Sequence, residues 1–263
     1  MAKSTGKNFL TYFALGIVAF ILYQVYRPER STEPTDQPAV SPLPQNLYAL
    51  HPADNSWPPD LKTDQLAPNL LADNYYLVLD GSGSMDGSEC VDTSTKMQAA
   101  IHALQQFVEQ IPTSANIGLY VFDNTGSHER LALGNHAHNS VTRLIGTARA
   151  GGGTPLSAAI TQGYNALTRQ AAAQLGYGNY HLVIVTDGQA SPGYEPTNTV
   201  SQILSISPVV MHTIGFCIGE DHSLNQHGLT FYKAADDPAS LAQGLTEVLA
   251  EMPDFSVTAF GEN

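Results

Sequence analysis

The sequence predicts a doubly wound α/β fold, in which a mostly parallel six-stranded sheet has helices on both faces. Short apolar runs recur along the chain, and amphipathic segments of helical period lie between several of them. This alternation favours parallel pairing, because each helix returns the chain to the edge of the sheet where the next strand starts. The hydrophobic content of 43% is high enough for one sizeable core.

The expected strands are short runs of apolar or alternating residues, bounded by turn residues. They cover 75–79, 116–122, 129–133, 181–186, 209–216 and 230–234. Asn124-Thr125-Gly126 predicts a hairpin turn between the second and third strands. Two of the other runs end in Asp-Gly. Ligands of doubly wound sheets bind beyond the carboxyl ends of the strands, so both Asp-Gly turns are expected at that edge.

Three helices are expected from the spacing of apolar residues. The first covers 96–111 and stops before Pro112. The second opens at 154–155 and the third covers 237–252, and each has a proline at its expected first position. Proline is tolerated there because its missing N–H would have no partner within the helix.

A transmembrane helix is expected at 9–26, after a short segment of residues 1–8. No residue between Lys7 and Arg27 is charged, and the stretch is just long enough to cross a bilayer at about 1.5 Å per residue. The following residues offer no small-x-small cleavage site, so an uncleaved anchor is favoured over a removed signal peptide. Flanking basic residues give a weak positive-inside signal, which favours a cytoplasmic N-terminus and an exported domain. In a bacterium this would be an inner-membrane protein with its domain on the periplasmic side.

Residues 27–72 are expected to form an extended linker. Nine of the 16 prolines of the chain lie between Pro28 and Pro68, and proline disfavours regular structure. The last part of the linker, around Trp57 and 70–71, is expected to pack on the domain that follows. That domain is expected to cover 73–252, which leaves 253–263 as a C-terminal tail.

The charge balance argues against binding of nucleic acid. Asp and Glu outnumber Lys and Arg by 24 to 11, so a phosphate backbone would find few cationic contacts. The two cysteines, Cys90 and Cys217, lack the paired spacing of a zinc site. They are either two free thiols or one disulfide, and both are expected near the carboxyl edge of the sheet.

Three motifs lie where chemistry is expected. Residues 80–84 read Asp-Gly-Ser-Gly-Ser, residues 151–156 read Gly-Gly-Gly-Thr-Pro-Leu, and residues 185–188 read Val-Thr-Asp-Gly. Together, in this order, they resemble the von Willebrand factor A (VWA) family over roughly 73–252. The resemblance implies a Rossmann-like VWA fold with an intact metal-ion-dependent adhesion site (MIDAS). Its ligands would be Asp80, Ser82, Ser84, Thr154 and Asp187.

The chemistry of these residues agrees with the resemblance. Hydroxyl and carboxylate oxygens are hard ligands, which suit Mg²⁺, or Mn²⁺ as a substitute, better than zinc or copper. Glycines at 81 and 83 are expected to let the loop fold tightly enough for both serines to face one ion, and bulkier residues there should spread the ligands apart. The family is thought to bind a partner when a carboxylate of that partner replaces water on the ion.

Other interpretations of these residues are more ordinary. Ser82, Ser84 and Thr154 could be helix caps or turn residues, and both Asp-Gly pairs could be simple turns. His128, His136 and His138 are expected in a solvated loop, and His222 and His227 are also expected at the surface. The serines lack a nucleophile-elbow frame, and the glycine run lacks the Lys-Ser/Thr of a phosphate loop.

The sequence thus predicts a membrane-anchored binding protein that is not an enzyme. It would bind Mg²⁺ and hold a protein partner, as in adhesion, through an Asp or Glu carboxylate of that partner. The alternative is an accessory subunit of an AAA+ ATPase or chelatase-like complex, because bacterial VWA proteins with a Gly-Gly-Thr-Pro-Leu loop often resemble partners of such ATPases. That alternative requires a cytoplasmic domain.

Overall fold

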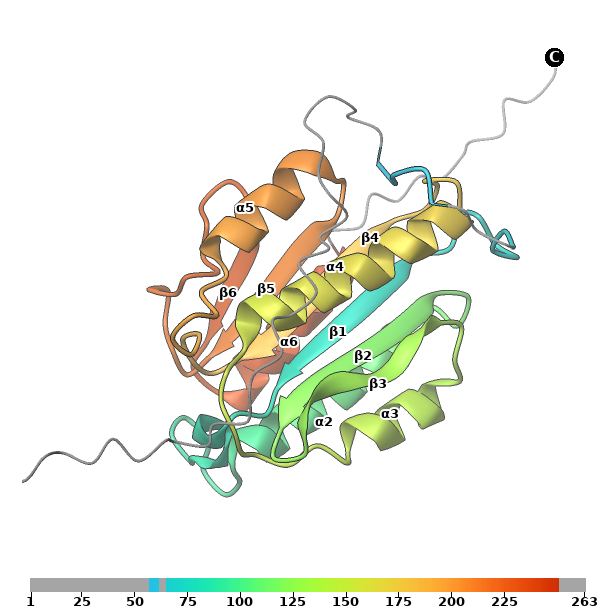
Figure 1. The fold of residues 1–263 in the computed structure, drawn as a ribbon. Helices are drawn as coiled ribbons and strands as arrows, with labels where there is room; N and C mark the ends of the chain where they lie inside the picture. The colour runs from blue at the N-terminus through green and yellow to red at the C-terminus, as the bar shows by residue number, and fades with distance from the viewer. Residues whose placement is uncertain (1–56, 62–64, 251–263) are drawn as a thin grey trace, which may run out of the picture. The chain divides into compact units, whose positions relative to one another are not determined.

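The computed structural model describes residues 57–61 and 65–250, and in them one six-stranded sheet (Figure 1). The strand order is β3-β2-β1-β4-β5-β6, and only the β2–β3 pair is antiparallel. This confirms the predicted sheet and its hairpin. The strands are β1 (Asn74–Asp80), β2 (Asn116–Asp123), β3 (Gly126–Gly134), β4 (Tyr180–Thr186), β5 (Val210–Phe216) and β6 (Phe231–Ala235).

Helices cover both faces of the sheet. Helices α2 (Lys96–Gln110), α3 (His138–Ile145) and α6 (Pro238–Ala250) pack on one face, and α4 (Leu156–Ala173) and α5 (Thr197–Ile206) pack on the other. A short 3-10 helix, η1 (Gly83–Asp86), follows β1. The predicted two-faced cover is therefore confirmed.

Two of these helices, α3 and α5, were not predicted. Each buries only two apolar side chains: Val141 and Ile145 in α3, and Val200 and Ile203 in α5. Such short segments carry too few apolar positions for their period to be recognised. The expected loop around His138 is therefore wrong, because that residue begins α3.

The central strands have no face exposed to solvent. Every residue of β1, β2 and β4 is buried. Strands covered on both sides appear as continuous apolar runs, which is the pattern the sequence shows. The core divides into one apolar cluster on each side of the sheet.

The predictions for the two ends of the chain lie mostly outside the described residues. The expected membrane helix at 9–26, most of the linker and the tail at 253–263 are in this category. Within 57–61 and 65–250, no helix has both the length and the apolar character needed to span a membrane. Trp57 packs edge-on against Tyr180, with ring centroids 4.9 Å apart, as expected for the end of the linker. Leu71 does not pack, since 74% of it is exposed.

The order of the strands creates a switch point at the centre of the sheet. From β1 the chain goes through α2 to β2 on one side, and it later crosses back through α4 to β4 on the other side. The loops after β1 and β4 therefore diverge at their carboxyl ends, where ligands of such folds bind. Asp80 ends β1, and Asp187 follows β4 directly.

Candidate metal centre

Asp80 is a fully buried carboxylate at the switch point. Its Oδ1 accepts a hydrogen bond of 2.8 Å from the backbone N–H of Ser82, and its Oδ2 accepts one of 2.5 Å from the Thr186 hydroxyl. Burial raises the pKa of Asp80 to about 6, although the hydrogen bonds from Ser82 and Thr186 act in the opposite direction. A carboxylate so poorly solvated is stabilised in its charged form by a nearby cation.

Ser82, Ser84 and Asp187 form a continuous chain of oxygens. The two serine hydroxyl oxygens are 3.0 Å apart, and the Ser84 hydroxyl donates to Asp187 Oδ1 over 2.7 Å. Ser82 and Asp187 are buried, whereas Ser84 is exposed. The structure therefore brings four of the five expected residues together, with Ser84 on the solvent side.

Thr154 joins this group through its loop. The N–H of Gly151 donates to Gly81 O over 2.7 Å, and the N–H of Gly83 donates to Gly152 O over 3.1 Å. The N–H of Thr154 itself donates to the hydroxyl of Ser191. These backbone contacts hold the 151–154 loop against the 80–84 loop.

The glycines of the 80–84 loop have different roles from those expected. Neither has a left-handed backbone conformation. A Cβ at Gly81 would lie 2.7 Å from Asp123 Cβ, so this glycine permits close packing on the end of β2. A Cβ at Gly83 would meet only Gly152 O, at an ordinary 3.7 Å. The expectation that a bulkier residue at 83 spreads the ligands is therefore wrong.

The helix-cap interpretation is also wrong for two hydroxyls. Ser82 precedes η1 but makes no side-chain cap hydrogen bond. Helix α4 begins at Leu156 after Pro155, which occupies the cap position, so Thr154 lies outside the helix. The conformation of the backbone at these helix ends therefore does not explain why hydroxyl residues stand there.

Lys96 is part of the site and was missed by sequence reasoning. Its Nζ lies 2.6 Å from Asp187 Oδ2 and 3.4 Å from Glu89 Oε2, and only 8% of its side chain is exposed. Burial disfavours the charged ammonium, but its contacts with Asp187 and Glu89 outweigh this, so the pKa of Lys96 lies above its usual value. A lysine at the first position of a helix opposes the helix dipole, and this was the available signal.

Asp123, at the end of β2, supports the 151–154 loop and was also missed. Its Oδ2 forms an ion pair of 2.6 Å with Arg130 and accepts a hydrogen bond of 3.0 Å from the N–H of Arg149. Burial opposes its charge, but the hydrogen bonds from Arg149 and Thr125 and the charge of Arg130 hold the pKa of Asp123 below its usual range. The carboxylate therefore anchors the segment that leads to Thr154.

The described histidines of the sequence analysis lie in different surroundings. His136 Nε2 lies 2.9 Å from Ala132 O, and His128 is exposed. The prediction that His222 lies at the surface is wrong, because this residue is buried and its Nε2 lies 2.9 Å from Gly188 O. In the part of the chain that the structure describes, no group of three or more His, Cys, Asp and Glu could hold a metal. The expected ligand set contains only two carboxylates, Asp80 and Asp187, and its other three members are hydroxyl residues, so this criterion does not apply to it.

The cysteines lie at the expected edge as free thiols. The Cys217 thiol donates to the backbone oxygen of Glu89, the neighbour of Cys90, over 3.3 Å.

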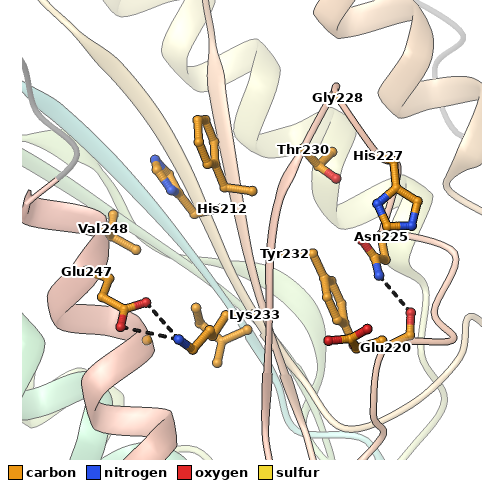
Figure 2. Close-up of a pocket in the computed structure, with 13 residues that line it drawn as sticks. His212, Glu220, Asn225, His227, Gly228, Thr230, Tyr232, Lys233, Glu247 and Val248 are labelled. Carbon is orange, nitrogen blue, oxygen red and sulfur yellow. Dashed lines mark hydrogen bonds and ion pairs between the residues drawn. The ribbon is translucent and has the colours of Figure 1, made fainter.

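A cavity of about 330 Å³ lies elsewhere, along β6 and α6, and none of the five expected ligands lines it (Figure 2). The fold and its edge cluster thus define a doubly wound domain with an oxygen-rich site at the switch point.

Comparison with known proteins agrees with this class. Residues 75–189 match the family described as von Willebrand factor type A domain. No curated protein matches the sequence. Similar solved structures include an aerotolerance-related membrane protein from Bacteroides fragilis, with a TM-score of 0.54 and 14% identity over 68% of this chain and 98% of that chain.

Two further structures extend the comparison. The pilus adhesin SpaC from Lactobacillus rhamnosus GG has a TM-score of 0.52 and 16% identity, over 72% of this chain and 31% of that chain. Proximal thread matrix protein 1 from the mussel byssus, with a zinc-occupied MIDAS motif, has a TM-score of 0.55 and 16% identity, over 68% of this chain and 47% of that chain. These likenesses show the fold. The family match covers residues 75–189, so this part of the chain is similar to a von Willebrand factor type A domain.

Proposed function

We propose that this VWA-like domain binds a divalent cation, Mg²⁺ with Mn²⁺ as a substitute, and holds a protein partner through it. The observation that carries the proposal is the row of oxygens from Ser82 through Ser84 to Asp187, with the buried Asp80 behind it. Hard oxygen donors suit Mg²⁺. The zinc-occupied MIDAS motif of the mussel protein supports divalent binding at the same kind of motif.

The residues fit such an ion. Asp187 is buried and joins the oxygen row through its Oδ1, while its Oδ2 faces the ammonium of Lys96 at 2.6 Å. Asp187, Ser82, Ser84 and Thr154 would hold the ion, which would supply a positive site for an anionic group. Asp80 would also contribute charge, while its two hydrogen bonds fix the loop that carries the serines. Ser84 is exposed, so a carboxylate of a partner could reach the site from solvent.

The direct test measures Mn²⁺ binding by calorimetry with the full-length chain in detergent. Asp80→Asn keeps the volume of the side chain but removes its charge, so its Mn²⁺ affinity is expected to fall at least tenfold. Asp236→Asn, at an exposed position outside the site, is the matched control and is expected to bind as the wild type does. Equal affinities for wild type and Asp80→Asn would refute the proposed site.

A partner held through the ion should depend on it. Partner capture by the immobilised chain is expected with Mg²⁺, and it should be lost with a chelator and with Asp80→Asn. Capture that is unchanged by the chelator would contradict the metal-bridged contact. The adhesin among the similar structures supports this kind of function.

We further propose that the segment 9–26 anchors the chain in a bacterial inner membrane and that the domain is periplasmic. The similar membrane protein from Bacteroides fragilis supports an association of this fold with membranes. Alkaline phosphatase fused behind residue 263 is active only after export, so an active fusion is expected. An inactive fusion would instead favour the accessory subunit of an AAA+ ATPase.

A further inference from the structure

The ammonium group of Lys96 lies against the candidate metal centre. Asp187 has two different neighbours: its Oδ1 accepts from Ser84, while its Oδ2 faces Lys96 Nζ at 2.6 Å. The serine side is the side of the expected ion, and the lysine lies on the other oxygen. The carboxylate of Asp187 thus bridges the oxygen row and an internal cation.

Lys96 is held in this position by its helix. It begins α2, where the N-cap Thr95 and Gln98 exchange hydrogen bonds in a capping box. The backbone N–H of Lys96 donates to Gly87 O over 2.8 Å, and its side chain is 8% exposed. The ammonium is therefore a fixed charge of the site rather than a solvated surface group.

We propose that Lys96 is a built-in counter-cation of the metal centre, which weakens its attraction for a divalent ion and strengthens its attraction for an anionic partner. This inference rests on the proposed function. Asp80 and Asp187 each supply one negative charge, and Lys96 cancels one of them. Opposite charges at such short distance and low exposure are poorly screened by water.

Glu89 does not restore the lost negative charge. Its carboxylate lies 3.4 Å from Lys96 Nζ, but 72% of its side chain is exposed to solvent. Exposed ion pairs contribute little, because water screens them. A bound divalent ion would therefore leave one positive charge in excess at the centre. That excess favours a carboxylate or another anionic group of the partner over a neutral one.

The experiment compares two lysines of the full-length chain. Lys96→Met removes the ammonium and keeps the apolar stem, and it is expected to raise Mn²⁺ affinity at least tenfold over the wild type, which corresponds to about 1.4 kcal/mol. Lys233→Met is the matched control. Lys233 forms an ion pair with Glu247 between β6 and α6, and neither residue is one of the five expected ligands (Figure 2). Its replacement is expected to change the affinity less than twofold.

The direction of the change separates a charge role from a structural one. Without metal, Lys96→Met is expected to melt below the wild type, because it leaves the buried Asp187 without its counter-charge. A merely structural lysine would lower both the melting temperature and the Mn²⁺ affinity. An Mn²⁺ affinity of Lys96→Met equal to or weaker than that of wild type would overturn the inference.

Two further variants keep the test decisive if Lys96→Met does not fold. Lys96→Gln is neutral but still donates hydrogen bonds, and it is expected to bind Mn²⁺ at least tenfold more tightly than the wild type. Lys96→Arg keeps the charge and is expected to stay within threefold of it. A Gln variant that binds no better than Arg would overturn the inference. The proposed function fails separately, if wild type and Asp80→Asn bind Mn²⁺ alike.

Discussion

The hydrogen bond from Thr186 to Asp80 gives a sharp prediction, because the neighbouring strand offers a matched control. Thr186→Val replaces the hydroxyl by a methyl of similar size and removes the donor to Asp80 Oδ2. Both residues are fully buried, so water cannot take its place. A hydrogen bond to a charged group contributes about 1.5–3 kcal/mol, and we expect a loss of about 2 kcal/mol.

For a domain of this size the loss corresponds to a melting temperature that is lower by roughly 4–8 °C. The assay is thermal unfolding of the full-length chain, followed by circular dichroism in the presence of a chelator. Thr213→Val in β5 is the control. Thr213 is also fully buried, but its hydroxyl has no hydrogen-bond partner among the described residues. Its replacement is expected to be neutral or stabilising, and equal losses for the two variants would refute the role given to Thr186.

Two further predictions concern packing and pH. Gly81→Ala is expected to lower the free energy of unfolding by about 1–3 kcal/mol, because its Cβ would lie 2.7 Å from Asp123 Cβ. Gly83→Ala has space for its Cβ and should have the melting temperature of the wild type. Similar melting temperatures for both variants would contradict this reasoning. Burial lowers the pKa of His181 to about 4 and, with the nearby His181, that of His212 to about 3. Both rings then stay neutral in the folded chain while the unfolded chain binds protons below about pH 6.5. The free energy of unfolding in urea should therefore fall by about 2 kcal/mol per histidine between pH 7 and pH 5, and an unchanged urea midpoint would exclude this linkage.

The sequence determined the sheet because burial on both faces leaves a local mark. Runs such as 75–79 and 181–186 are apolar throughout, and they are buried in β1 and β4. Helix α2 was predicted to within one residue, since its apolar period and the following proline are also local signals. Helices α3 and α5 were not predicted, because the two buried residues of each do not establish a helical period.

The sequence by itself also determined which strand ends carry the candidate site. Asp80 and Asp187 follow buried strands, and in a parallel sheet the carboxyl ends of strands share one edge. Only the tertiary structure decided which side chains meet there. The contact of Lys96 with Asp187, the donor role of Thr186 and the burial of His222 join segments that are distant in sequence. Such contacts depend on how helices and loops pack on the sheet, and that packing leaves no periodic pattern in the amino-acid sequence.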